Sequence, residues 1–375
     1  MIKPIRNKIL SGAASAAAAC AAAVYAYYYA ALPLNINIET GAAVSDMGFS
    51  PASLKITENG AQYFLGGIPL KRANVTEQER RYVIPSGKPF GIKVLSNGVM
   101  VISAEDGSPA KSAGLKAGDV ITSVNGTEVF TNEELAREIQ NCENCADIVY
   151  RRGGGEISAT VEPTGAEGVM KIGAWVRDSA AGIGTLTFIE PESGTFGGLG
   201  HAVSDVTTCE PVPLLSGEIA PAEIYDVAKG ECGSAGELCG AILPEADAGE
   251  VLKNTSAGVF GKYSGDISGE TVPVAFRQEV KAGEASILTT VDGEEPREYS
   301  IEIERINLAD LKGSKAMLIK ITDPELIEKT GGIVRGMSGS PIIQDGRLAG
   351  AVTHVLVNDP SRGYAVFAES MLDNE

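Results

Sequence analysis

A serine flanked by glycines, with a β-hairpin directly after it, is the feature that most restricts the fold of this chain. Residues 336–341 read Gly-Met-Ser-Gly-Ser-Pro and place Ser338 in a tight bend. Two β-rich runs follow, residues 341–344 and 348–352, and Asp345-Gly346 between them is a typical two-residue hairpin turn. The segment therefore predicts a β-rich unit that presents a serine hydroxyl at a glycine-rich bend.

The same bend predicts an oxyanion hole, made by the backbone amides of Gly336 and Ser338. Glycine permits backbone conformations that other residues avoid, so the two amides can point into one pocket. Gly-x-Ser-Gly-x-Pro before a hairpin resembles the nucleophile loop of chymotrypsin-like serine peptidases. An ordinary turn is the competing interpretation.

A nucleophilic serine needs a base, and the chain has only two histidines, His201 and His354. His201 ends the glycine-rich segment Phe-Gly-Gly-Leu-Gly-His and precedes Ser338 by 338 − 201 = 137 residues. This order and spacing are those of a peptidase with two β-barrels, so we expect His201 to be the base. His354 follows an alternating run and competes for that role; a histidine bonded at a strand end is the alternative.

Length and charge limit the class of protein. The 375 residues suggest two to three domains, and 44% hydrophobic residues indicate a folded chain. The net charge of −18 argues against nucleic acid and anionic membrane surfaces as partners of the folded part.

The first 34 residues differ from the rest of the chain. Lys3, Arg6 and Lys8 precede an uncharged run of 24 residues, from Ile9 to Leu32, that is rich in alanine and tyrosine. Its length and its basic flank predict a transmembrane signal anchor over residues 1–34, with the remainder outside the cytoplasm. A cleaved signal peptide is the alternative.

The six cysteines are too few for a disulfide scaffold in a chain of this length. Cys142 and Cys145 form a lone Cys-x-x-Cys without a second pair, so we expect no metal site and no cofactor. Cys232 and Cys239 are either a disulfide or two free thiols.

Residues 35–81 alternate short β-like runs with turns and predict an extracytoplasmic stalk or small β element. Residues 82–163 then resemble a PDZ domain of the type associated with bacterial proteases. Thr131 is expected to cap a helix, with Glu134 completing a capping box. In PDZ domains an apolar-Gly-apolar loop binds a peptide carboxylate, and the matching residues here are Phe90, Gly91 and Ile92.

Residues 166–375 contain many short strand-like runs separated by glycine turns, which predicts an all-β barrel or sandwich. The fold class expected for the whole chain is mainly β. It comprises an N-terminal transmembrane anchor, an α+β PDZ domain and a C-terminal chymotrypsin-like double β-barrel.

Three segments in order resemble the SpoIVB family of sporulation serine peptidases: Gly-Ala-Trp-Val-Arg-Asp-Ser (173–179), Phe-Gly-Gly-Leu-Gly-His (196–201) and Gly-Met-Ser-Gly-Ser-Pro (336–341). The resemblance covers about residues 80–375. It implies a self-processing peptidase secreted from the forespore into the space between the forespore and mother-cell membranes. There it would cleave a membrane-bound regulator of an intramembrane metalloprotease, which then activates a late sigma factor.

The resemblance also implies site residues. The family histidine and serine fall on His201 and Ser338, and its triad aspartate, fifteen residues before the serine, falls on Asp323. A generic two-barrel layout would instead take the aspartate from between the barrels, at Asp226 or Asp247. Thr353, fifteen residues after Ser338, matches a position tied to activity and is expected to line the site.

Two classes of function remain after this reading. The first is a membrane-anchored serine endopeptidase regulated by its PDZ domain, with protein substrates and without nucleic acid, metal or cofactor. The second is a non-catalytic PDZ scaffold that binds the tails of membrane proteins. The presence of both His201 and Ser338 favours the enzyme.

Overall fold

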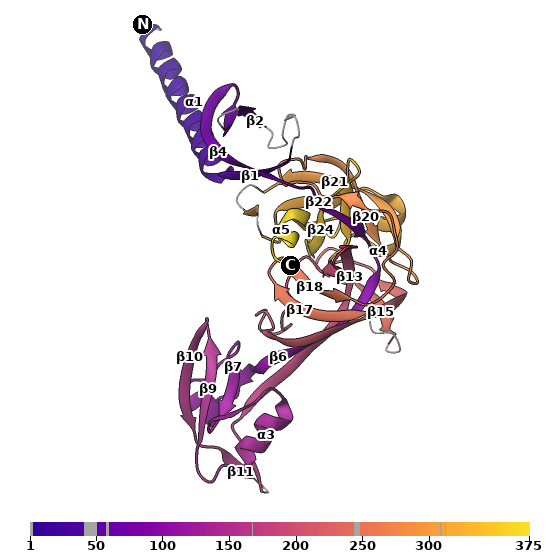
Figure 1. The fold of residues 1–375 in the computed structure, drawn as a ribbon. Coiled ribbons are helices and arrows are strands. Elements are labelled where there is room, and N and C mark those ends of the chain that lie inside the picture. Colours follow the sequence, from indigo (N-terminus) through magenta and orange to yellow (C-terminus); the bar gives the residue numbers. More distant parts are fainter. Residues whose placement is uncertain are drawn as a thin grey trace.

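The computed structural model describes residues 3–40, 51–57, 60–166, 168–243, 248–307, 310–311 and 313–375. Within them the chain forms a small N-terminal sheet, two β-barrels, and a mixed unit of strands and helices at the far end of two long strands (Figure 1). The fold is mainly β, as predicted.

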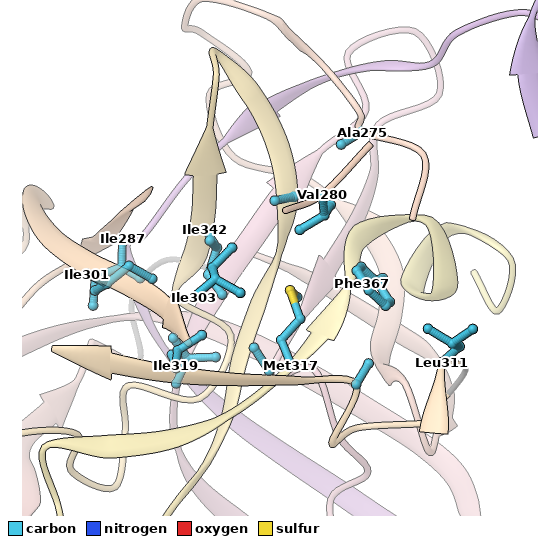
Figure 2. Close-up of a cluster of buried hydrophobic side chains, with 14 of the residues drawn as sticks. Ala275, Val280, Ile287, Ile301, Ile303, Leu311, Met317, Ile319, Ile342 and Phe367 are labelled. Carbon is cyan, nitrogen blue, oxygen red and sulfur yellow. The ribbon is translucent and has the colours of Figure 1, made fainter. Parts of the chain in front are cut away.

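The second of the two barrels in chain order is a closed barrel of six strands, in the order β20-β21-β22-β25-β24-β23. The strands are β20 (Gly283–Thr289), β21 (Arg297–Ile306), β22 (Met317–Ile321), β23 (Pro341–Gln344), β24 (Arg347–Val355) and β25 (Arg362–Phe367), with helices α4 (Pro324–Thr330) and α5 (Ala368–Leu372). Alternate strand residues point inward. Figure 2 shows the resulting core, which includes Ile287, Ile301, Ile303, Met317, Ile319, Ile342 and Phe367.

The predicted hairpin after the serine is confirmed. Gln344 pairs with Arg347 across the turn, and Asp345 and Gly346 both have positive φ, 52° and 71°. Two successive residues with positive φ are the requirement of a type I′ turn, which Asp-Gly meets at low cost.

The first barrel is a ring of six strands within the described residues: β6-β15-β17-β18-β14-β13, closed by pairing of β13 with β6. The strands are β6 (Pro89–Ala104), β13 (Ala174–Ile189), β14 (Thr195–Gly198), β15 (Leu214–Ala228), β17 (Gly249–Thr255) and β18 (Gly258–Tyr263). The strands β5 (Tyr82–Pro85), β16 (Glu237–Ile242) and β19 (Val272–Pro273) extend the sheet.

The mixed unit is inserted between β6 and β13. It contains α2 (Pro109–Ser112), β7 (Val120–Val124), β8 (Thr127–Glu128), α3 (Asn132–Gln140), β9 (Ala146–Arg152), β10 (Gly155–Val161), β11 (Thr164–Ala166) and β12 (Val169–Lys171). The predicted capping box at Thr131 and Glu134 is present. The far halves of β6 and β13 complete this unit (Figure 1). Ala104, the last residue of β6, pairs with Ala174, the first residue of β13, at the strand ends farthest from the first barrel.

The predicted boundaries at 82–163 and 166–375 therefore do not divide the structure into its units. A linear reading assigns each strand to one domain, whereas β6 and β13 each belong to both the first barrel and the inserted unit. At 16 residues each, both strands are longer than the usual range of about 3–10 residues, which leaves enough length for both units.

The assignment of Phe90, Gly91 and Ile92 to a carboxylate-binding loop is wrong. These residues lie inside the first barrel, where Gly91 pairs with Ile183 of β13 on one side and Ala220 of β15 on the other. Phe90 and Ile92 are buried in the barrel core. Because strands flank both edges, no row of free amides remains there for a ligand.

Gly91→Val is accordingly expected to destabilise the first barrel. A Cβ at Gly91 would lie 2.4 Å from the side chain of Ile242, so the larger residue overpacks the sheet, at a cost of about 1–3 kcal/mol in unfolding free energy. Gly182→Val is the matched control, since Gly182 pairs with Ile92 but has open space around its Cβ position. Urea unfolding of both variants measures the difference; equal stabilities would contradict the packing argument.

The N-terminal sheet has the order β1-β4-β3-β2, from β1 (Asn35–Glu39), β2 (Ala52–Thr57), β3 (Gly60–Leu65) and β4 (Ile68–Gln78). It contacts the second barrel: the Asn37 side chain donates to Glu369 at 2.7 Å, and Arg80 bridges Glu39 and Glu279. Helix α1 (Lys3–Ala31) packs on this sheet through Tyr25, whose hydroxyl donates to the Pro69 carbonyl at 2.9 Å.

In the described part of the chain, no helix has both the length and the apolar character that crossing a bilayer requires. The predicted anchor over residues 1–34 is therefore not supported.

Candidate active site

The nucleophile loop lies between α4 and β23 and presents Ser338 from the second barrel. The Ser338 hydroxyl donates to the Thr353 carbonyl at 2.8 Å, and the Gly339 amide donates to Val352. Gly336 and Gly339 have φ of 96° and 97°. A Cβ on Gly339 would lie 1.9 Å from the carbonyl oxygen of Thr185, so both the conformation and the space at this bend require glycine.

Two amides of this loop have no hydrogen-bond acceptor among the described residues, those of Gly336 and Ser338. The neighbouring amides are all used: Arg335 donates to Gly236, Met337 to Val334, and Ser340 to Met337. Unpaired amides two residues apart beside a serine hydroxyl are suited to bind a negatively charged oxygen. The geometry thus fits the oxyanion hole predicted at Gly336 and Ser338.

His201 is held in one tautomer by the backbone. Its Nδ1 lies 2.8 Å from the carbonyl oxygen of Ala202. A carbonyl only accepts hydrogen bonds, so Nδ1 carries the proton and Nε2 of the neutral ring keeps its lone pair. Burial lowers the pKa of His201, and the bond to Ala202 offsets this only in part, so the ring is neutral at pH 7.

Thr185 of β13 brings the histidine loop and the serine loop together. Its amide donates to the Ser338 carbonyl at 2.9 Å, and its own carbonyl accepts from Leu199, two residues before His201, at 3.3 Å. Gly200 packs against Thr353, where a Cβ would lie 2.9 Å from the threonine methyl. His201 and Ser338 therefore lie on facing loops of the two barrels, although no hydrogen bond joins their side chains.

His354 is the second histidine of the site. It directly follows Thr353, and its ring centroid lies 5.0 Å from that of His201. Desolvation, the charge of His201 and the charge of Lys315 lower the pKa of His354 to about 4. Thr353 itself is buried. Its hydroxyl donates to the Ser314 carbonyl at 2.6 Å, and its carbonyl accepts from the Ser338 hydroxyl.

Asp323 does not contact His201. Its carboxylate caps helix α4 by accepting from the amides of Glu325 and Leu326 at 3.0 and 3.1 Å. Leu318 of β22 is level with His354, because both pair with Tyr364. Asp323 lies five residues further along, or roughly 16 Å at strand spacing. In this structure Asp323 is therefore a helix N-cap, and its carboxylate is not the acceptor at Nδ1 of His201.

The other aspartates considered from the sequence do not replace it. Asp226 accepts from the amide of Val227, and Asp247 lies outside the described residues. Asp205, close to His201 in sequence, binds Arg177 and the amides of Thr207 and Thr208. Among described residues, the acceptor at Nδ1 of His201 is the Ala202 carbonyl.

Asp323→Ala is expected to lower the unfolding free energy by about 0.5–2 kcal/mol while kcat stays close to that of the wild type. The variant loses two cap hydrogen bonds, whereas Asp323→Asn retains an N-cap acceptor and should preserve stability. Denaturant unfolding and peptide turnover, measured on both variants, give the test. A large fall in kcat for Asp323→Asn would show that the carboxylate serves His201 after all.

The family model described as SpoIVB peptidase S55 matches residues 168–372, which is more than half of the chain. The chain belongs to this family. A second model, described as PDZ domain, matches residues 100–145. The S55 match covers the His201 and Ser338 loops, and the PDZ match lies in the unit inserted between β6 and β13.

Other similar proteins match shorter stretches of the chain. A probable periplasmic serine endoprotease, DegP-like, of Brucella suis is 44% identical over 68 residues, which are 17% of this chain and 13% of that protein. Serine protease Do-like HtrA of Lactococcus lactis is 40% identical over 70 residues, 18% of this chain and 17% of that protein. The chain thus spans less than a fifth of these relatives. The crystal structure of the PDZ domain of an SdrC-like protein from Listeria monocytogenes is 29% identical, covers 22% of this chain and 90% of that one, and has a TM-score of 0.21.

In this S55 peptidase the apolar-Gly-apolar run that lies in the PDZ unit is Ile172, Gly173 and Ala174, which leads into β13. Gly173 has φ of 71°, and the carbonyls of Ile172 and Gly173 accept from Ala110 and Glu105 at 2.8 and 3.0 Å. This run was not predicted from the sequence, because it lies after residue 163, where the predicted domain ends. The repeated apolar-Gly-apolar pattern was the signal available.

Strand β13 has an open edge beside helix α3. From Ala174 to Thr185 it pairs with β6, and its other edge gains a strand partner among described residues only from Leu186 onward. The Asn132 amide at the start of α3 donates to the Asp178 carboxylate at 2.9 Å, which holds the helix beside this edge. Trp175 on the same stretch is 66% exposed. A strand edge next to a helix is the surface to which extended peptides add.

Among the described residues of the S55 peptidase, no group of three or more metal-ligating side chains comes together. Cys232 and Cys239, for which a disulfide was one of two possibilities, are both free thiols, as are the other four cysteines.

The S55 peptidase is expected to lose stability and activity as the pH falls below about 6.5. Both histidines have pKa values below the ordinary value of about 6.5, His354 near 4. The unfolded chain therefore binds protons that the folded chain excludes, and stability is complete above pH 6.5 and declines toward pH 4. The acid limb of kcat/KM should have its midpoint below 6.5, because neutral His201 is the base.

Urea unfolding at pH 7.5 and 5.0 and a pH–rate profile measure both effects. His354→Asn should show a smaller difference in stability between the two pH values than the wild type. An acid limb centred above 6.5 would contradict the assignment of a desolvated histidine as base.

Proposed function

We propose that this serine peptidase is an endopeptidase that acts through an acyl-enzyme, with Ser338 as nucleophile and His201 as general base. The observation that carries the proposal is the loop itself: a serine hydroxyl beside two unpaired amides, facing a histidine whose Nε2 is free to accept a proton.

The reaction begins with a rotation of the Ser338 hydroxyl. In the resting arrangement it donates to Thr353, whose carbonyl cannot take up the proton. The hydroxyl turns to Nε2 of His201, and Oγ attacks the peptide carbonyl as His201 takes the proton. The amides of Gly336 and Ser338 bind the resulting oxyanion, and His201 then gives its proton to the leaving amine. Water repeats the sequence to release the acyl group.

The function proposed in the cell is that of the sporulation peptidases to which the family model refers. The peptidase processes itself and cleaves a membrane-bound regulator of an intramembrane protease, outside the cytoplasm of the forespore. Membership of the S55 family and the presence of a PDZ unit, which is suited to bind polypeptides, support this proposal. The PDZ unit would select the substrate by adding an extended segment to the β13 edge beside α3.

Self-cleavage provides the first test. Purified wild type should produce discrete fragments, purified Ser338→Ala should not, and tagged Ser338→Ala should be cut when wild type is added. Ser340→Ala is the matched control, since the Ser340 hydroxyl is buried and donates to Thr289. Fragments from Ser338→Ala alone would contradict the proposal.

The signalling role requires a test in a sporulating host. Ser338→Ala in place of the wild type should block maturation of the late mother-cell sigma factor, whereas Ser340→Ala should allow it. Normal maturation with Ser338→Ala would instead favour the PDZ scaffold as the function, since that alternative needs no catalytic serine.

A further inference from the structure

Thr185 makes three hydrogen bonds that meet at the catalytic loops. It is 1% exposed and lies on β13 of the first barrel. Its hydroxyl donates to the Gly336 carbonyl at 2.7 Å, its amide donates to the Ser338 carbonyl at 2.9 Å, and its carbonyl accepts from the Leu199 amide. One residue of the first barrel thus binds both the serine loop of the second barrel and the loop that carries His201.

The Gly336 carbonyl belongs to the peptide group between the two free amides. That group is fixed at both ends: its oxygen by Thr185, and its N–H, that of Met337, by the Val334 carbonyl at 3.2 Å. Rotation of this group changes the angle between the amides of Gly336 and Ser338. Gly336, with φ of 96°, offers little resistance to such a rotation because it has no side chain.

We propose that Thr185 is a positioning residue whose hydroxyl keeps the two oxyanion amides aimed at one point. The inference rests on the proposed function of Ser338 and adds the residue that prepares its pocket. The hydrogen bonds of Thr185 go to backbone groups of Gly336, Ser338 and Leu199, and none goes to the Ser338 hydroxyl. It contributes by removing the rotational freedom that glycine gives the loop, so that the donors are in place before negative charge develops.

The geometry also makes the pocket dependent on the contact between the barrels. Both free amides belong to the second barrel, whereas the hydroxyl that orients them belongs to the first. The oxyanion hole is therefore complete only when the two barrels are docked.

Thr185→Val tests the proposal, because valine keeps the shape of threonine and removes the hydroxyl. We expect kcat for a fluorogenic peptide copied from the self-cleavage site to fall about 10- to 100-fold, with KM within about twofold of the wild type. Inhibition by a peptide aldehyde, whose adduct with serine places an oxyanion in the pocket, should weaken by the same factor. Thr185→Ser keeps the hydroxyl and should restore most of kcat.

Thr290→Val is the matched control, since Thr290 is also buried and donates its hydroxyl to a glycine carbonyl, that of Gly87 at 3.1 Å. It should lose similar stability and keep its kcat. If Thr185→Val does not fold, Thr185→Ala removes the same hydroxyl with less crowding. A folded Thr185→Val or Thr185→Ala with wild-type kcat, or an equal loss in Thr290→Val, overturns the proposal. Activity that survives Ser338→Ala would contradict the proposed function instead.

Discussion

Ser338→Ala is expected to lower kcat by at least about a thousand-fold while the protein remains folded. Removal of the nucleophile from a serine peptidase leaves only the catalysis supplied by binding and the oxyanion hole. The hydroxyl makes one hydrogen bond, to Thr353, and a bond of this kind contributes about 0.5–1.5 kcal/mol to stability. Turnover of a peptide substrate and urea unfolding, measured on the same preparation, separate the two effects.

The serine two residues later is the internal reference for this substitution. Ser340 lies in the same loop but is fully buried and bonded to Thr289, so Ser340→Ala should affect stability more than chemistry. Wild-type turnover by Ser338→Ala would exclude Ser338 as the nucleophile.

His201→Ala is expected to be as damaging as Ser338→Ala, with a loss of at least about a thousand-fold in kcat. The residues of a catalytic unit act together, so the double variant should be hardly worse than either single one. The measurement is kcat of the two single variants and of the double variant. If the two residues contributed independently, the factors by which the single substitutions lower kcat would multiply in the double variant.

His354→Ala should cost far less. The His354 ring lies beside the His201 ring. The hydrogen bond that fixes a histidine tautomer, however, is made by His201, to the Ala202 carbonyl. If His354→Ala were the more damaging of the two, His354 would be the base and the order of His201 before Ser338 would carry no mechanistic meaning.

The local parts of the site were predictable because short segments determine them. The glycines at 336 and 339, the Asp345-Gly346 turn and the capping box at Thr131 each express a backbone conformation that few other residues accept. The distance in sequence between His201 and Ser338 indicated two barrels for another reason. In a peptidase with two barrels, a loop on each barrel supplies one of these residues.

The parts that failed depend on contacts distant in sequence. Phe90-Gly91-Ile92 has the composition of a PDZ loop, and only the pairing of β6 with both β13 and β15 shows that its edges are occupied. Asp323 fits a family spacing, yet a residue before Pro324 at a helix start is also what an N-cap requires. The role of Thr185 has no local signal, because it consists of bonds to loops 14 to 153 residues away.

Strands β6 and β13 each belong to both the first barrel and the PDZ unit, and this limits which fragments of the chain can fold. Neither strand can be cut without opening the barrel, so fragments that end at the PDZ boundary should not yield a working peptidase. Ala104 and Ala174 are cross-strand neighbours, and a two-residue Asn-Gly turn could join the strands there in place of residues 105–173.

Such a shortened chain would be an ordinary barrel with a long hairpin. The PDZ unit is thus an insertion into a hairpin. It is joined to the barrel by two strands that pair on both sides of a register shift between Arg177 and Ser179, instead of by a flexible linker. Ala174, on the edge proposed to accept a peptide, and Thr185 at the serine loop lie eleven residues apart on the same strand. A polypeptide bound at one end of β13 would consequently reach Ser338 over a fixed distance. The number of residues between the bound segment and the cleaved bond should therefore be nearly constant among substrates.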